Sequence, residues 1–269
     1  MKWRPYKILL IRLSIALFLF TLSRILFAIF NPVTLSGLNL LPFIYGIRYD
    51  LSALVFIHSI FILLHIYPTS SFFKKNYQTF LSLIFHIMNG VALLLNSIDT
   101  AWFPFTQKRT TADFFKLIST GDDVGNNIGR YLLDYWYVLF IWAGLLFIGV
   151  LLYRKTKNNV SSFSLFKVPT RIIIFLVLTF CTLVFGRGGL QYKPLSIQSA
   201  VTAAGPASIP LVLNTPFTII KSFRDDPLPS TVYFTDKKAD ELFDPHQRLS
   251  TTAEFTHQNV RNNSGKFFV

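Results

Sequence analysis

The sequence is poor in the residues from which catalytic and metal sites are usually built. It has one cysteine, Cys181, so no internal disulfide can form and a cysteine-based metal site is excluded. Charged residues make up only 14% of the chain, and none of them forms a recognisable catalytic motif or the spacing of an EF-hand loop. What dominates is apolar: 52% of the residues are hydrophobic and 29 are phenylalanine. This composition excludes an ordinary soluble domain.

Five long apolar runs occupy most of the first 190 residues. Each is long enough to cross a hydrocarbon core of roughly 30 Å at about 1.5 Å per helical residue. Because only helices and closed barrels satisfy their backbone in lipid, and the runs are too long for barrel strands, they predict helices. We therefore expect an all-α membrane protein, with a five-helix transmembrane bundle in residues 1–190 and an extracytoplasmic juxtamembrane linker after it. The expected spans are residues 8–30, 43–67, 77–98, 132–153 and 172–189.

Basic residues predict the orientation of these spans. They gather before the first span, in the short connection after the second and in the connection after the fourth, whereas residues 31–42 carry no charge. The positive-inside rule then places the N-terminus in the cytoplasm and the C-terminus outside, across a plasma (inner) membrane. The formal net charge of +13 is spread over helix ends and forms no single stripe, so we expect the lipid bilayer as partner and no nucleic acid.

Several charges fall within the predicted spans, near the outer surface. Each needs a partner, a cavity or an interface, because a charge at membrane depth costs several kcal/mol. Two residues of the second span, Arg48 and Asp50, point to different helix faces, so we expect Asp50 to pair with another helix, through Arg24 or Arg187. The candidate outer-leaflet polar cluster consists of Arg24, Arg48, Asp50, Asp99, Arg109, Asp134 and Arg187.

Three interpretations of this cluster remain open. Its members are interfacial residues whose ion pairs fix helix packing, or they line a polar pocket for an anionic lipid head group or lipid-linked substrate, or they form a proton or ion relay. In the second interpretation Arg24, Arg48 and Arg187 hold the lipid. His58 and His65 share a helix face, but no carboxylate or cysteine lies at matching depth, so packed core histidines are favoured over a metal site. We assign no catalytic residue, cofactor-binding residue or metal ligand.

The polar segments outside the spans are the loop 99–131 and the tail. In the loop, aromatic residues alternate with charges, which is typical of a membrane interface, and residues 110–118 could form a short helix. In the tail, Pro206, Pro210 and Pro216 exclude a sixth span, since proline breaks a helix; we expect a surface-lying segment there. Residues 224–229 resemble a linker boundary, and residues 191–269 are expected to be a juxtamembrane segment and the start of a truncated soluble domain.

Short motifs in the expected order give the chain a resemblance to a known family. It resembles the membrane half of bacterial lipoteichoic acid synthase-like phosphoglycerol transferases, a branch of the alkaline phosphatase/sulfatase superfamily, over nearly all 269 residues. The motifs that carry the resemblance are residues 48–52, Asp99, residues 108–109, residues 113–115, residues 187–195 and residues 214–222.

The resemblance implies an extracytoplasmic catalytic domain after the tail. That domain would hold a divalent metal, commonly manganese, and a threonine or serine nucleophile that attacks a phosphodiester or related ester. Since His246 and His257 are isolated, no catalytic residue and no cofactor is assigned to the chain itself, and its own enzymatic activity is left undecided.

Two functions are therefore expected from the sequence. The first is a membrane-anchoring and lipid-substrate-presenting domain of a phosphoglycerol transferase/sulfatase-like envelope enzyme, without catalytic competence of its own. The second is a stand-alone polytopic membrane protein, either a small transporter or an envelope assembly factor. A transporter should show an inverted repeat and broken helices, and no convincing repeat is found. The sequence does not indicate the oligomeric state.

Overall fold

The computed structural model describes residues 3–32, 40–120, 129–157 and 166–223 of the chain. These residues form helices and short helical turns, and none of them lies in a strand. The longer helices are α1 (Arg4–Phe30), α2 (Leu41–Ile57), α3 (Ser59–Ile66), α4 (Lys75–Thr106), α7 (Trp136–Lys157) and α8 (Val168–Arg187). The shorter helices are α5 (Asp113–Thr120), α9 (Ile197–Ala204), α10 (Ile209–Val212) and α11 (Thr215–Ser222).

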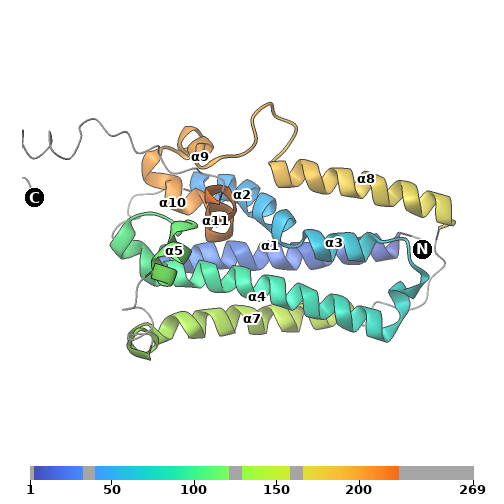
Figure 1. The fold of residues 1–269 in the computed structure, drawn as a ribbon, viewed down its shortest axis with the longest axis horizontal. Coiled ribbons are helices and arrows are strands. Elements are labelled where there is room, and N and C mark those ends of the chain that lie inside the picture. Colours follow the sequence, from blue (N-terminus) through green and yellow to red (C-terminus); the bar gives the residue numbers. More distant parts are fainter. Residues whose placement is uncertain (1–2, 33–39, 121–128, 158–165, 224–269) are drawn as a thin grey trace, which may run out of the picture. The chain divides into compact units, whose positions relative to one another are not determined.

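The long helices form the membrane bundle that the sequence predicted. In Figure 1, α1, α3, α4, α7 and α8 run lengthwise, and α9, α10 and α11 gather at one end. Helices α1, α4, α7 and α8 are each long and apolar enough to cross a membrane, and α2 with α3 makes a fifth, broken span. The all-α membrane fold is thus confirmed. We call the end where α1, α4 and α8 begin the proximal end, and the end where they finish the distal end.

The second span is bent, which the sequence did not predict. Helices α2 and α3 meet at an angle of 67°, and His58 between them leaves the helical conformation at φ −88° and ψ 11°. No proline or glycine stands at the break. Instead, both the backbone N–H and the ring Nδ1 of His58 donate to the carbonyl of Leu54, at 2.8 and 3.1 Å. A side-chain donor that competes for a helix carbonyl is a recognised cause of helix bending.

Two other spans differ from their predicted limits. Helix α4 continues to Thr106, so the start of the predicted loop 99–131 is helical and Phe103 is buried. Helix α7 begins at Trp136, after a helical turn at 129–134. Helix α5 overlaps the predicted short helix at 110–118. The predicted linker boundary at residues 224–229 and the rest of the tail to residue 269 lie outside the described residues.

The segment after α8 is built into the bundle. Val212, Leu213 and Phe217 are buried in the same core cluster as Leu19 of α1 and Leu93 of α4, and α11 packs against both α2 and α4. The predicted surface-lying position is therefore wrong for residues 211–219, which are all buried. The three prolines do divide the segment into short helices, as their lack of an N–H requires, but each piece turns its apolar side chains inward.

The proximal half of the bundle is held together around one buried arginine. Arg12 of α1 is fully buried and donates to Gln78 Oε1 at 3.0 Å and Thr156 Oγ1 at 3.2 Å. His65 Nε2 donates to the Pro5 carbonyl at 3.1 Å, which leaves its Nδ1 to accept from Arg12 at 3.5 Å. Arg12 thereby joins α1, α3, α4 and α7, and His65 is a hydrogen-bonded core histidine.

Candidate functional site

The distal half of the bundle contains an ion pair between α1 and α2. Arg24 Nη2 donates to Asp50 Oδ1, and the two side chains are 2% and 0% exposed. Gly46 stands one turn before Asp50 and allows this approach: a Cβ there would lie 2.5 Å from Cζ of Arg24. The predicted pairing of Asp50 with Arg24 is confirmed. Arg187 is not its partner.

The same arginine also holds the segment that follows α8. Arg24 Nη1 donates to the carbonyl oxygens of Leu211, Val212 and Leu213, the last two at 2.8 and 3.2 Å. These carbonyls lie at the end of α10, where the helix has no backbone donors left to offer them. The guanidinium group of Arg24 therefore supplies the hydrogen-bond donors that these three carbonyl oxygens lack.

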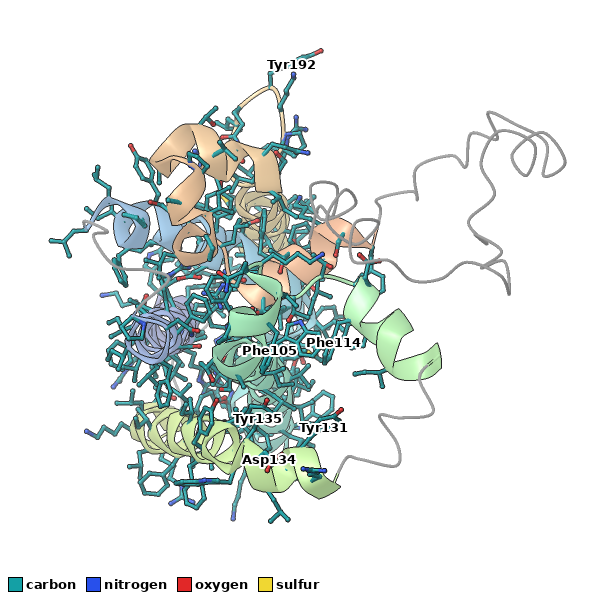
Figure 2. All side chains as sticks on the ribbon, turned by 90° about the vertical axis from the view of Figure 1, so that its left-hand side faces the viewer. Phe105, Phe114, Tyr131, Asp134, Tyr135 and Tyr192 are labelled. Atoms are coloured by element: carbon teal, nitrogen blue, oxygen red, sulfur yellow. The ribbon has the colours of Figure 1, made fainter. Side chains whose placement is uncertain are left out.

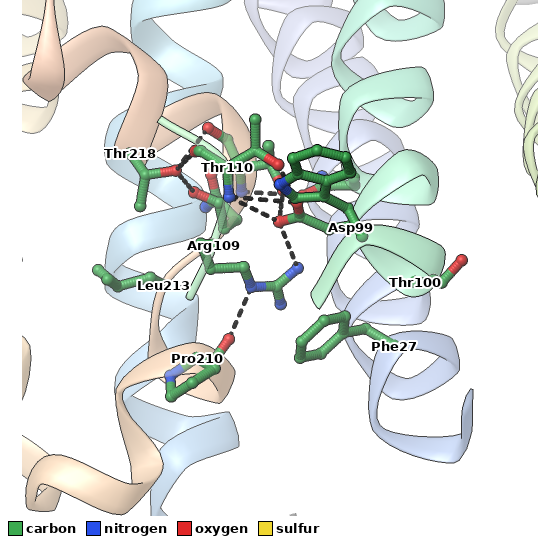
Figure 3. A network of polar contacts seen from close by, with 12 residues as sticks. Phe27, Asp99, Thr100, Arg109, Thr110, Pro210, Leu213 and Thr218 are labelled. Atoms are coloured by element: carbon green, nitrogen blue, oxygen red, sulfur yellow. Dashed lines mark hydrogen bonds and ion pairs between the residues drawn. The ribbon is translucent and has the colours of Figure 1, made fainter. Parts of the chain in front are cut away.

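A second ion pair lies beside the first. Asp99, near the distal end of α4, is fully buried and accepts from Arg109 Nη1 at 3.4 Å. It also accepts from the backbone N–H and the hydroxyl of Thr110, and from Thr215 Oγ1 at 2.5 Å. Figure 3 shows these contacts converging on Asp99. Several donors on one carboxylate are the arrangement that makes a buried charge tolerable.

Arg109 completes this network by reaching α10. Its Nε donates to the Pro210 carbonyl at 2.7 Å, and its guanidinium lies over the ring of Phe27, 3.5 Å from the centroid (Figure 3). Burial lowers the pKa of Arg109 to about 10, although the neighbouring Asp99 carboxylate raises it. Arg109 is therefore a cation at neutral pH, and the cation–π contact adds to its retention in a buried position.

Asn214 connects the two ion pairs through α11. Its Nδ2 donates to Asp50 Oδ1 at 2.7 Å, while its Oδ1 accepts from the N–H of Phe217 at 2.8 Å and caps α11. The next residue, Thr215, is held by Asp99 and by Asn96 Oδ1, which accepts from the Thr215 N–H at 3.1 Å. Asparagine at the N-cap is a favoured helix start, here combined with a tertiary contact.

We call this set of residues the clamp. It consists of Arg24, Asp50, Asp99, Arg109, Asn214 and Thr215. Its charged members are at most 4% exposed, and each carboxylate is paired with an arginine. The clamp has no exposed nucleophile or acid–base group. Its effect is to hold residues 210–218 against α1, α2 and α4.

The other two arginines of the predicted cluster lie apart from the clamp. Arg48 and Arg187 are exposed. Arg48 donates to the Gly188 carbonyl from Nε at 3.1 Å and from Nη2 at 2.8 Å, and also to Gln191 Oε1. Arg187 Nη2 donates to the carbonyls of Gln191 and Tyr192 at 3.4 and 2.5 Å. No carboxylate of the described residues lies within ion-pair distance of either arginine.

These contacts shape the loop 188–193, which we call the distal loop. Gly188 and Gly189 adopt φ of +92° and +126°, conformations that favour glycine, so the chain turns sharply at the end of α8. Tyr192 is 93% exposed and projects away from the helices in Figure 2. Arg48 of α2 and Arg187 of α8 contact the distal loop, and together with Tyr192 they place two arginines and an aromatic ring at the surface of the bundle.

The last member of the predicted cluster is separate again. Asp134 forms an exposed pair with Arg130 at 3.9 Å, one turn apart on the helical turn before α7. Figure 2 shows it far from Tyr192 of the distal loop. The structure thus divides the seven predicted residues into three groups: the clamp, the distal loop and this surface pair. The prediction that Arg24 acts with Arg48 and Arg187 on one lipid is wrong, because Arg24 is buried and bound to Asp50.

Sequence reasoning missed the uncharged members of the clamp. Asn214 and Thr215, like the neighbouring Asn96, carry no charge, so the search for charges inside spans did not assign them to the site, although residues 214–222 were noted as a motif. A polar residue in an apolar run is nevertheless a signal, because an amide in lipid needs a partner. In the described residues no three of His, Cys, Asp and Glu gather to hold a metal ion.

No family model matches this sequence, and neither a curated protein nor a solved structure was found to be similar to it.

Proposed function

We propose that this chain is the membrane-anchoring and lipid-substrate-presenting domain of a bacterial cell-envelope enzyme of the phosphoglycerol transferase/sulfatase type. The observation that carries the proposal is the clamp. It connects the chain after the last span to three helices of the bundle through two buried ion pairs. An anchor that only tethers a domain needs a single span, whereas this bundle also holds the chain leaving it in one position.

The rigid connection extends to the end of α11. The Ala112 N–H, just before α5, donates to Ser222 Oγ at 2.7 Å, and Thr218 Oγ1 donates to the Thr110 carbonyl at 2.6 Å. Release of this segment would break the hydrogen bonds that it makes with the charged groups of Arg24, Asp50 and Asp99. Each such bond contributes about 1.5–3 kcal/mol, so release is strongly unfavourable. A domain attached after residue 223 would be held close to the distal end of the bundle.

The distal loop is the part that we propose to bind lipid. Arg48 and Arg187 are exposed and bound only to neutral oxygens, so their positive charge is not compensated by the described residues. Guanidinium groups suit phosphate oxygens, and exposed aromatic rings such as Tyr192 are typical of head-group level. An anionic phospholipid or lipid-linked substrate of the outer leaflet is the ligand that this chemistry favours.

The family resemblance adds independent support. Its motifs include Asp50, Asp99 and Arg109 of the clamp, residues 187–195, which contain the distal loop, and residues 214–222. Motifs scattered along the chain thus meet at one end of the bundle. In this proposal the metal and the nucleophile belong to an extracytoplasmic domain beyond the described residues. The coding sequence after codon 269 tests this: a strand ending in Glu-Ser with later Asp and His ligands supports it, and an unrelated continuation contradicts it.

Lipid retention tests the role of the distal loop. The full chain would be incorporated into nanodiscs containing phosphatidylglycerol and phosphatidylcholine. The lipids that stay bound after its release from the nanodiscs would be counted by native mass spectrometry. Arg48→Gln with Arg187→Gln should weaken the binding of one of the retained phosphatidylglycerol molecules more than tenfold, since each basic group near a membrane surface contributes about 1 kcal/mol and the two act together. Arg130→Gln, which also removes an exposed arginine, should leave retention unchanged. Equal losses in both variants would contradict a specific site.

The alternative function is a stand-alone transporter or assembly factor, and the bend at His58 favours it. Broken spans are typical of secondary transporters. However, the break lies among apolar rings, with the Phe61 and Phe85 centroids 6.3 and 5.4 Å from the His58 ring. Water-soluble maleimide distinguishes the two functions: in a Cys181→Ser background, Ser59→Cys at the break should react in a transporter that admits water and stay unreacted in an anchor.

A further inference from the structure

The proximal end of the bundle contains a groove between α1 and α8. Its volume is about 420 Å³, and it is lined by Trp3, Tyr6, Lys7 and Leu10 on one side and by Ile173 and Val177, with their α8 neighbours, on the other. This volume falls within the range of small-molecule sites, roughly 300–1,000 Å³. Lys7 is the one charged residue in the lining.

The groove exists because α8 is poorly covered by the rest of the bundle. Only 6% of its apolar window is buried, and its main contacts are with α2 and α3. The side of α8 that faces the start of α1 is therefore left open. Since its residues are large and apolar, hydrocarbon is the occupant that their surface favours.

The positive charge at the end of the groove indicates which kind of lipid fits it. Lys7 lies at its rim and is exposed. Arg171 is 8% exposed and does not itself line the groove, but it precedes Ile174 and Leu178 of the lining on the same face of α8. Trp3 and Tyr6 are aromatic residues of the kind that occupy the head-group level. The arrangement therefore joins an apolar slot to a cationic rim, which is complementary to a lipid with a negative head group.

Among the residues that the structure describes, no acidic residue lies at the proximal end. Asp and Glu are absent from residues 1–49, 51–98 and 135–224. These segments include the start of α1, the connection between α3 and α4, the end of α7 and the start of α8, which are the described parts of the chain at the proximal end. Arg171 is buried and has no carboxylate partner among the described residues. Because a buried arginine without a carboxylate is costly, a phosphate of the bilayer is the anion that this end of the bundle favours.

We infer that this groove is a binding site for one anionic glycerophospholipid of the leaflet at the proximal end. One acyl chain lies between α1 and α8, and the phosphate contacts Lys7 beside Arg171. The lipid fills the gap that the protein leaves and holds α8 to α1. By the positive-inside rule this leaflet is the cytoplasmic one. The site is distinct from the distal loop and does not depend on the proposed function.

Native mass spectrometry with phosphatidylglycerol and phosphatidylcholine of matched chains tests the site. In the Arg48→Gln, Arg187→Gln background, which removes the lipid of the distal loop, Lys7→Gln should lower phosphatidylglycerol retention about fivefold, the factor that corresponds to about 1 kcal/mol per basic residue at a membrane surface. Ile173→Trp should lower it further by filling the groove. The matched control is Ile172→Trp, because Ile172 is also exposed on α8 but does not line the groove. Retention in that control should equal that of the background protein.

A second measurement uses the fluorescence of Trp3 in the wild-type protein. Trp3 lines the groove, and the chain has only three other tryptophans. The difference in fluorescence between the wild type and Trp3→Phe isolates the Trp3 signal in nanodiscs with brominated lipids. Brominated phosphatidylglycerol should quench Trp3 several-fold more strongly than brominated phosphatidylcholine, and Arg48→Gln with Arg187→Gln should leave this difference intact.

Three results would overturn the inference. The first is equal quenching of Trp3 by both lipids. The second is an equal loss of lipid in Ile172→Trp and Ile173→Trp, which would indicate general damage to α8. The third is a dimer that Ile173→Trp dissociates, which would assign the groove to a second copy of the chain. Failure of the distal-loop experiment alone would leave the groove intact and count only against the proposed function.

Discussion

At the scale of residues, the four arginines of the predicted cluster have two different environments. Arg24 and Arg109 are buried and paired with carboxylates, whereas Arg48 and Arg187 are exposed and bound to neutral oxygens. Burial explains the difference, since a charge removed from water needs a counter-charge and an exposed one does not. The buried pair therefore serves packing, and the exposed pair is available to ligands.

Gly46→Ala should destabilise the protein by about 1–3 kcal/mol, the usual cost of overpacking a filled interior. The added Cβ would lie 2.5 to 2.8 Å from three atoms of the Arg24 guanidinium group, which would have to leave Asp50 or α10. Thermal unfolding in detergent measures the effect. Gly144→Ala in α7 meets nothing within 4 Å and should be neutral or stabilising by up to about 1 kcal/mol. A destabilisation of the same size in both variants would show that the clash is not the cause.

Arg109→Gln should destabilise the protein by an amount that does not change between pH 6 and pH 9. The pKa of Arg109 is lowered by burial to about 10, below its value in an unfolded chain. Both states therefore keep the proton throughout this range, and only above about pH 10 does the folded state lose it first. The test compares the unfolding free energies of wild type and variant at both pH values. A difference that varies with pH in this window would mean that Arg109 is neutral in the folded protein.

At the scale of elements, α10 and α11 owe their position to polar contacts from three other helices. Their apolar side chains complete the distal core, but apolar contacts alone do not specify the register of such short pieces. The directional bonds of Asn214 to Asp50 and of Thr215 to Asp99 do. The junction between α10 and α11 is thereby fixed to elements that are far away in the sequence.

Thr215→Val should loosen this segment without changing its shape. Valine keeps the volume but removes the hydroxyl that donates to Asp99, which costs about 1–3 kcal/mol for a charged acceptor. Hydrogen–deuterium exchange should become several-fold faster in residues 209–222. Thr202→Val in α9 is the matched control, because its hydroxyl is exposed and bonds only within its own helix. If hydrogen–deuterium exchange is unchanged in Thr215→Val, the clamp is not what keeps residues 209–222 rigid.

At the scale of the whole molecule, the distribution of charge between the two ends predicts how the bundle is inserted. The acidic residues of the described helices, Asp50, Asp99, Asp113 and Asp134, all lie near the distal end, whereas the proximal segments carry only basic residues. The positive-inside rule responds to basic residues in short connections. The proximal end is therefore expected in the cytoplasm.

Cysteine labelling of intact cells checks this orientation, and the single native cysteine makes it simple. In a Cys181→Ser background, Tyr192→Cys in the distal loop should react with a membrane-impermeant maleimide. Lys155→Cys at the proximal end of α7 should react only after the cells are opened. The reverse pattern would invert the orientation and would also remove the proposed extracytoplasmic position of the chain after α11.

Much of the candidate site was accessible from the sequence, but its grouping was not. That Asp50 pairs with an arginine of another helix, Arg24 or Arg187, follows from the expense of lone charges in lipid and from the helix faces of Arg48 and Asp50; only the structure selects Arg24. The clustering of Asp99 with Arg109 was also expected. Their separation from Arg48 and Arg187 was not, because sequence spacing gives the depth of a residue and not its angle around the bundle.

The amino-acid sequence by itself determined that this is an all-α membrane protein with about five spans. Runs of apolar residues as long as a bilayer have only one common structure, since lipid offers no partner for an open backbone. The tertiary structure alone decided the bend at His58, the burial of residues 211–219 and the groove between α1 and α8. These depend on which helices meet, and a proline-interrupted apolar segment fits a surface or an interior equally well until partners such as Arg24 and Asp99 are brought to it.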